Sequence, residues 1–161
     1  MEYKYVHELM TSPAICCDEN TVIVDVIKVF KNFNIGFLPI TKNNILIGVV
    51  TDRDVLVRGF NKDLNKCLIK EIMTADQIEF VNKDTNLIDA AKIMAEKKIR
   101  RLVVLNDGKV VGVLTAKNLI KDKNLIDYVL KTYCENKTLK EYSIYMNSNP
   151  HDSIKASDFP L

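Results

Sequence analysis

The sequence predicts an α/β protein built from two β-α-β-β-α repeats. Three observations support this prediction: identical residues recur at one fixed spacing, helical periodicity precedes strand periodicity in both halves, and turn residues separate the paired strands. The recurrence holds without a gap from Thr21 to Arg58, with the equivalent residue 64 positions later, as for Thr51 and Thr115. Because one such unit cannot bury its apolar face alone, we expect the two repeats to pack on each other.

Each repeat has the pattern of a short strand, a helix, two strands and a second short helix. In the first repeat these are predicted at 13–15, 23–33, 37–41, 45–51 and 52–58, and in the second at 77–81, 87–95, 102–105, 110–115 and 116–121. The second hairpin carries Asp107-Gly108, which is a strong turn signal. At the start of the second long helix, Asn86 and Asp89 have the spacing of a capping box.

The repeats divide the chain into a first repeat at 1–62, a second repeat at 63–121 and a C-terminal extension at 122–161. Apolar residues at helical spacing predict an amphipathic helix over 124–136. For the rest of the extension a docking segment and a disordered tail both remain open, because serines and prolines alternate there with scattered apolar residues.

Composition and charge exclude several classes of protein. Hydrophobic residues make up 47% of the chain and charged residues 27%, as in globular proteins and unlike disordered ones. The formal net charge of +2 is too balanced for a protein that mainly holds nucleic acid. No apolar run reaches the ~18–20 residues of a membrane span, and the N-terminus lacks the apolar stretch of a signal peptide. We therefore expect a cytoplasmic protein with no nucleic-acid or membrane partner.

The four cysteines predict no structural metal site. No two of them form a C-x-x-C pair, and the chain has only two histidines. Reduced cysteines that pack as small apolar residues are the simplest interpretation. An enzyme that uses Cys16 or Cys17 as a nucleophile is the lowest-ranked alternative, because the sequence offers no oriented base. No catalytic residue is therefore predicted.

Two segments carry the strongest chemical signal, 48–54 and 112–118, and each runs from a strand into the first turn of a helix. A glycine on the strand leaves room for close approach, and free N–H groups at the helix start favour an anion. A threonine that can donate to phosphate, a cation, and an acceptor for sugar hydroxyls follow as Thr51, Arg53 and Asp54, and as Thr115, Lys117 and Asn118. Such groups fit a phosphorylated ribose, although a threonine at a helix start is also a common N-cap.

In its Met-Thr leads (Met10-Thr11 and Met73-Thr74), helices, hairpins and G-h-x-T segments, the sequence resembles a tandem pair of cystathionine-β-synthase (CBS) domains, over roughly residues 6–121. This Bateman module, here of the stand-alone bacterial type, implies repeats related by a pseudo-twofold axis, with two clefts between them that commonly bind AMP, ADP, ATP or S-adenosylmethionine. The resemblance implies a non-enzymatic regulatory protein that senses cellular energy, forms a homodimer and signals to a separate effector protein.

The resemblance also implies which residues line each cleft. The first cleft combines Thr51, Arg53 and Asp54 with Thr74, Ile78, Arg100 and Arg101, where Ile78 is expected against adenine and Arg101 facing phosphate. The second combines Thr115, Lys117 and Asn118 with Thr11, Ala14, Ile15, Phe37 and Pro39.

The two clefts are expected to differ in affinity. The first has a charged Asp54 and the pair Arg100-Arg101, where the second has Asn118 and Gly36-Phe37. Charge-assisted hydrogen bonds are the stronger ones, so the first cleft is expected to bind the more anionic ligand, and more tightly. A sensor of cyclic di-AMP or of S-adenosylmethionine and a ligand-free dimerisation scaffold remain alternatives.

Overall fold

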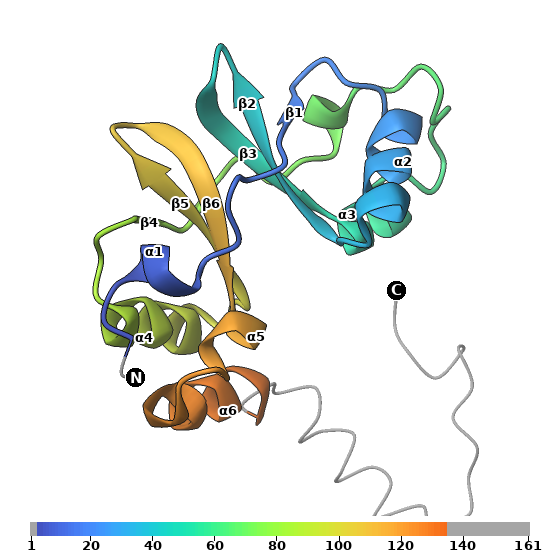
Figure 1. Ribbon diagram of the computed structural model, residues 1–161. Coiled ribbons are helices and arrows are strands. Elements are labelled where there is room, and N and C mark those ends of the chain that lie inside the picture. Colours follow the sequence, from blue (N-terminus) through green and yellow to red (C-terminus); the bar gives the residue numbers. More distant parts are fainter. Residues whose placement is uncertain (1–2, 135–161) are drawn as a thin grey trace, which may run out of the picture.

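The computed structural model describes residues 3–134 and confirms an α/β fold with two repeats in one mixed sheet (Figure 1). In chain order the elements are α1 (Val6–Leu9), β1 (Cys17–Asp18), α2 (Ile23–Phe33), β2 (Phe37–Lys42), β3 (Ile45–Thr51), α3 (Asp52–Arg58), η1 (Ile69–Glu71), β4 (Phe80–Asn82), α4 (Leu87–Lys97), β5 (Arg101–Asn106), β6 (Lys109–Thr115), α5 (Ala116–Leu119), η2 (Lys123–Leu125) and α6 (Ile126–Cys134).

The six strands lie in the order β1-β2-β3-β6-β5-β4, so the two hairpins are neighbours at the centre. Each repeat pairs its short first strand in parallel with the next strand and closes with an antiparallel hairpin. The two hairpins share a single register pair, Ile45 in β3 with Lys109 in β6. Figure 1 shows the strands toward the centre of the molecule and the long helices α2 and α4 on its outer sides. Most backbone hydrogen bonds between the halves are therefore made by the lead segments and not by the two hairpins.

The segment that leads into each repeat packs against the other repeat. In the first lead, Val6 is fully buried in the core of the second repeat, and its N–H donates to the Thr85 carbonyl at 3.0 Å. In the second lead, Ile69 is buried in the core of the first repeat and its N–H donates to the Thr21 carbonyl at 2.8 Å. The two cores are thus each completed by a segment from the opposite half.

The long helices are held by apolar faces and by left-handed residues that end them. Helix α2 buries Ile23 and Val26 and ends at Asn34 with φ 51°, and α4 ends at the equivalent Lys98 with φ 54°. Two local predictions were wrong. The first strand lies at Cys17–Asp18 and not at 13–15, and Asn86 caps α4 by accepting from the Ile88 N–H at 2.9 Å without a reciprocal bond from Asp89.

The second repeat carries an additional cover. Helix α6 packs against α4 and α5, with Leu125 and Val129 buried in the second core. Among the described residues no such helix covers the first repeat, in which Leu56 and Phe60 are 72% and 78% exposed. The predicted helix at 124–136 is confirmed as far as Cys134, and the rest of the extension lies outside the described residues.

The longest helices within residues 3–134 are 11 residues long, too short for any of them to be a candidate membrane span. Within the same residues, no three His, Cys, Asp or Glu side chains gather where they could hold a metal ion.

Candidate functional site

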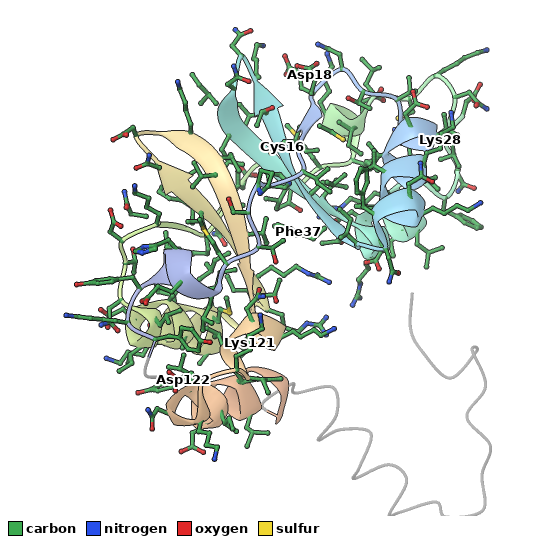
Figure 2. All side chains as sticks on the ribbon, in the orientation of Figure 1. Cys16, Asp18, Lys28, Phe37, Lys121 and Asp122 are labelled. Atoms are coloured by element: carbon green, nitrogen blue, oxygen red, sulfur yellow. The ribbon has the colours of Figure 1, made fainter. Side chains whose placement is uncertain are left out.

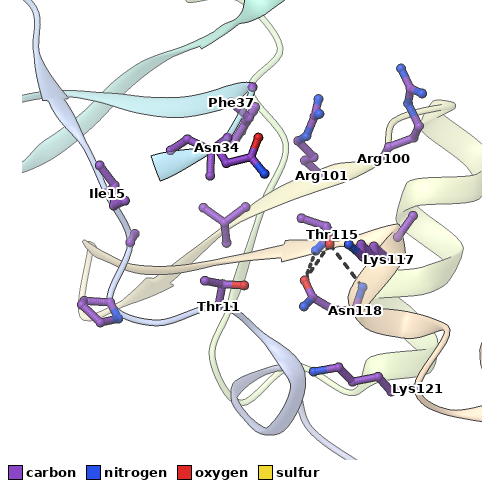
Figure 3. Close-up of a pocket in the computed structure, with 16 residues that line it drawn as sticks. Thr11, Ile15, Asn34, Phe37, Arg100, Arg101, Thr115, Lys117, Asn118 and Lys121 are labelled. Atoms are coloured by element: carbon purple, nitrogen blue, oxygen red, sulfur yellow. Dashed lines mark hydrogen bonds between the residues drawn. The ribbon is translucent and has the colours of Figure 1, made fainter. Parts of the chain in front are cut away.

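A pocket of about 650 Å³ lies between the two repeats (Figure 3). Four stretches of chain line it: the first lead at 11–15, the end of α2 and the start of β2 at 34–37, the start of β5 at 100–101, and the β6–α5 junction at 113–121. Because these stretches come from both halves, the pocket depends on how the repeats sit against each other. We call it the Thr115 pocket.

At the β6–α5 junction, Thr115 and Asn118 hold each other in place. The Thr115 hydroxyl and N–H both donate to Asn118 Oδ1, at 2.7 and 2.8 Å, and the Asn118 N–H donates back to the hydroxyl at 3.2 Å (dashed in Figure 3). The N-cap interpretation therefore holds for Thr115. A hydroxyl has one proton, so Thr115 donates to a ligand phosphate only after releasing Asn118.

The charge of the Thr115 pocket comes from side chains of the second repeat. Arg100, Arg101, Lys117 and Lys121 line it, and its lining contains no aspartate or glutamate. Figure 3 shows Ile15 on one side of the pocket and Arg100 and Lys117 on the other. The pocket therefore has an apolar side and a cationic side.

The position of the two arginines in this pocket differs from the sequence-based assignment. Arg100 and Arg101 were expected in the first cleft, which left the second cleft poor in positive charge, but both arginines line the second. The reason is the position of Arg101, whose guanidinium carbon lies 5.7 Å from the centre of the Phe37 ring. Phe37 and Arg101 hold equivalent positions in the two repeats, and their contact places both where the two halves meet (Figure 3).

The other residues predicted for the second cleft are brought together, with one exception. Thr11, Ala14, Ile15, Phe37, Thr115, Lys117 and Asn118 all line the pocket. Pro39 does not, because it is buried in β2 beside Val49. Sequence reasoning missed Lys121, which lies one helical turn after Lys117, and Asn34, whose left-handed backbone ends α2.

Three residues predicted for the first cleft, Thr51, Asp54 and Thr74, form a different arrangement together with Arg58, which we call the Thr51 cluster. The Thr51 hydroxyl donates to Asp54 Oδ2 at 2.7 Å, as its counterpart does in the second repeat. Arg58 Nη1 lies 3.6 Å from Asp54 Oδ1 and donates to Thr74 Oγ1 at 3.1 Å. Sequence reasoning missed Arg58, although its spacing of four residues from Asp54 on one helix predicts an ion pair.

Two further residues predicted for the first cleft, Arg53 and Ile78, lie apart from these contacts. Arg53 is exposed on the first turn of α3, where its N–H donates to Asp52 Oδ1 at 2.9 Å, and Ile78 is half-buried. Asp52 in turn lies over Gly36, so that a Cβ on Gly36 would be 2.6 Å from its Oδ2. At the positions equivalent to Asp52 and Gly36 the second repeat has Ala116 and Arg100, so a carboxylate is absent there and a cation is added.

The strand glycines make room for the lead segments. A Cβ on Gly112 would lie 2.5 Å from Met10 Sδ and 3.0 Å from the Thr11 carbonyl oxygen, and one on Gly48 would lie 2.5 Å from Met73 Sδ. The close approach expected from these glycines is therefore made by the chain itself. Because Gly48 and Gly112 have no side chain, the Met-Thr leads can lie directly against the sheet.

The cysteines near the first lead are poor nucleophiles. Burial raises the pKa of the Cys16 thiol, and burial together with the neighbouring Cys16 raises the pKa of Cys17. A raised pKa leaves less thiolate at neutral pH, and thiolate is the reactive form. The structure therefore adds no support for cysteine chemistry.

The family model described as "CBS domain" matches residues 6–59 and 69–123. CBS domain-containing protein YhcV of Bacillus subtilis is 27% identical over 115 residues, which cover 71% of this chain and 81% of the relative.

Two solved structures with bound adenosine compounds are similar to the chain. The structure of CBSX2 in complex with AMP is 29% identical, has a TM-score of 0.63, and the match covers 74% of this chain and 95% of that one. The CBS domain pair of protein MJ0100, in complex with 5′-methylthioadenosine and S-adenosyl-L-methionine, is 27% identical with a TM-score of 0.64, and the match covers 73% and 93% of the two chains.

Proposed function

The chain belongs to the CBS domain family, and we propose that it is a non-catalytic regulatory module whose Thr115 pocket binds an adenosine ligand that carries phosphate. The observation that carries the proposal is the charge of the pocket, which has four cationic side chains and no carboxylate in its lining. AMP in one structural relative and 5′-methylthioadenosine in another support the adenosine part.

The two sides of the pocket suit the two ends of such a ligand. A purine is flat and apolar on its faces, which suits the side with Ile15 and the Phe37 ring. Phosphate suits the side with Arg100 and Lys117, since hydrogen bonds between ionised partners are the strong ones. AMP, ADP and ATP therefore fit best, and cyclic di-AMP is compatible with the same charges. The sulfonium of S-adenosylmethionine is repelled by the four cations.

A ligand in this pocket can bias the arrangement of the two halves. The lining of the pocket comes from both halves, which contact each other through one β3–β6 register pair and through the lead segments. A ligand with different affinity for two arrangements shifts the population between them, which a partner protein can detect. We include in the proposal a homodimer and a separate effector protein. The exposed Leu56, Val57 and Phe60 support a protein contact at the end of α3.

Thermal unfolding with a panel of ligands tests the proposal. AMP, ADP, ATP, cyclic di-AMP and S-adenosylmethionine are each added to the full chain, and a nucleotide at ~100 times its Kd adds about 2.7 kcal/mol of stability, a rise of a few degrees in Tm. The Arg101→Gln variant, which at tenfold weaker binding is expected to lose about half of the rise, is the matched variant. Absence of a shift with every compound contradicts the proposal and favours a dimerisation scaffold without a ligand.

A further inference from the structure

Arg58 links the two repeats at the Thr51 cluster. Its Nη1 donates to the Thr74 hydroxyl at 3.1 Å and to the Ile72 carbonyl at 3.0 Å, and it lies 3.6 Å from Asp54 Oδ1. Asp54 belongs to the first repeat, whereas Ile72 and Thr74 belong to the lead of the second. One side chain therefore donates two hydrogen bonds to the second lead and forms an ion pair with Asp54 of the first repeat.

The second repeat has no counterpart to this arginine. The position equivalent to Arg58 is Asp122, which is 7% exposed and accepts from the Asn124 N–H at 2.9 Å. Asp122 thereby begins the turn η2 that leads into α6 (Figure 2). The same position thus carries Arg58, which contacts the Thr51 cluster, in the first repeat, and Asp122, which begins the turn before α6, in the second. Thr11, the equivalent of Thr74, lines the open Thr115 pocket.

A guanidinium is a donor only, so it uses up acceptors. The hydroxyls of a ribose need acceptors, and Asp54 Oδ1 is the carboxylate oxygen that does not take the Thr51 hydrogen bonds. We propose that the Arg58 side chain competes with the ribose of a ligand for Asp54 Oδ1. An adenosine ligand then fills the Thr115 pocket first, and it fills the Thr51 cluster only after displacing Arg58. This inference rests on the proposed function, because it concerns the same class of ligand.

The competitor is displaceable. The Arg58 side chain is 48% exposed, and ion pairs at that exposure are weak, since water and salt screen them. Once it leaves, Asp52 and Asp54 remain on α3 with Arg53 as the cation of the first turn. The opened cluster therefore favours a ligand without a large negative charge. A neutral adenosine compound is the better probe of this place than ATP.

Isothermal titration calorimetry on the full chain tests the proposal with 5′-methylthioadenosine, which is neutral, and with AMP. In the unchanged protein we expect one tighter site per chain and a second at least tenfold weaker. Arg58→Ala is expected to tighten the second site tenfold or more and to leave the first unchanged. Adding Asp54→Ala to Arg58→Ala removes the gained site, whereas adding Asn118→Ala weakens the other.

Two control variants separate the effect of Arg58 from loss of charge or fold. Arg53→Ala removes the same charge from the same helix without touching Thr74, and we expect no tightening. Arg58→Lys keeps the charge but loses the planar fork, so it gives an intermediate gain and remains usable if Arg58→Ala unfolds. Two equal sites in the unchanged protein, or no gain in either Arg58 variant, overturn the inference while leaving the proposed function in place.

The remaining outcomes also decide between the two proposals. If the unchanged protein binds neither probe and Arg58→Ala binds one equivalent, the competitor is supported and the proposed role of the Thr115 pocket fails. If no protein in the set binds either probe, both proposals fail.

Discussion

Arg101 and Phe37 occupy equivalent positions in the two repeats, and in the folded chain they contact each other, with the guanidinium carbon 5.7 Å from the ring centre. Equivalent residues of two repeats can meet only beside the axis that relates the repeats. Each lies opposite the threonine of its own repeat in the hairpin register, Phe37 opposite Thr51 and Arg101 opposite Thr115. The pair therefore connects the Thr51 cluster with the Thr115 pocket.

Arg101→Gln is expected to weaken AMP binding about tenfold or more. The substitution keeps a hydrogen-bonding side chain but removes its charge, and charge-assisted bonds contribute about 1.5–3 kcal/mol against about 0.5–1.5 for neutral ones. Calorimetric titration measures the change. Arg53→Gln on the exposed first turn of α3 is the control, with an expected change of less than threefold. Equal affinity of Arg101→Gln and the unchanged protein would contradict the cationic role of this pocket.

Asn118→Ala is expected to reduce nucleotide affinity more than Asp54→Ala does, which reverses the order predicted from sequence. The reversal follows because Asn118 lines the open pocket, whereas Asp54 is engaged by Arg58. Both substitutions break a cap at a helix start, so each lowers the free energy of unfolding by about 1 kcal/mol. Parallel urea unfolding and titration separate the two effects. A greater loss of binding in Asp54→Ala would restore the sequence-based order.

The affinity of the Thr115 pocket is expected to rise from AMP to ADP to ATP and to fall with added salt. Each phosphate brings more negative charge to the four cations, and the Debye length shortens from about 10 Å at 0.1 M salt to about 3 Å at 1 M. Titrations at both salt concentrations measure this. The double variant Lys117→Ala/Lys121→Ala is expected to flatten the order. Binding of 5′-methylthioadenosine as tight as that of ATP would be inconsistent with charge recognition.

Gly112→Ala is expected to destabilise the fold by about 1–3 kcal/mol, because the new methyl group meets Met10 Sδ and the Thr11 carbonyl. Urea unfolding measures the loss. Met10→Ala added to Gly112→Ala removes the sulfur contact but not the backbone one, so only part of the loss should return. Unchanged stability in the single variant would mean that the lead segment moves away freely.

Glu8 and Glu71 are expected to make stability depend on acid pH. The two glutamates lie at equivalent positions of the two lead segments. Hydrogen bonds from the Tyr5 and Lys4 N–H groups lower the pKa of Glu8, and a hydrogen bond from the Leu68 N–H lowers the pKa of Glu71. A pKa lowered by folding stabilises the protein above the ordinary value of about 4.3, and this stabilisation is lost as the pH falls through the lowered pKa.

The double variant Glu8→Gln/Glu71→Gln checks this dependence. Glutamine does not titrate, so the fall in unfolding free energy between about pH 6 and pH 3 should be smaller than in the unchanged chain. Urea unfolding at several pH values measures it, with Glu96→Gln on α4 as a control outside the leads. Identical pH profiles would show that the two carboxylates do not contribute.

The repeats and their elements were predictable because hydrophobic periodicity and turn residues act locally. The β2–β3 and β5–β6 hairpins lie within a residue or two of their predicted bounds, and the Thr-to-Asp and Thr-to-Asn caps follow from spacing alone. The strand at 13–15 was wrong since pairing with β2 takes place at Cys17–Asp18, a tertiary preference that local propensity does not contain.

The distribution of charge between the two sites was not predictable in the same way. It depends on the axis between the repeats, which brings Arg100 and Arg101 to the wall of the Thr115 pocket, and on the reach of Arg58 to Thr74 across the junction. Residue spacing along one repeat says nothing about either distance. The sequence indicated a close approach at Gly48 and Gly112, but the group that approaches each glycine is a Met-Thr lead and not a ligand.

The exchanged lead segments have a consequence for how the chain is made. Helix α1 leaves the ribosome early, yet its backbone and core partners, among them Thr85 and Val81, are synthesised more than seventy residues later. Until then Val6 and Leu9 have no surface to join. A protease that clips the nascent chain near Met10 would therefore spare the first half and leave the last-made half without its closing segment.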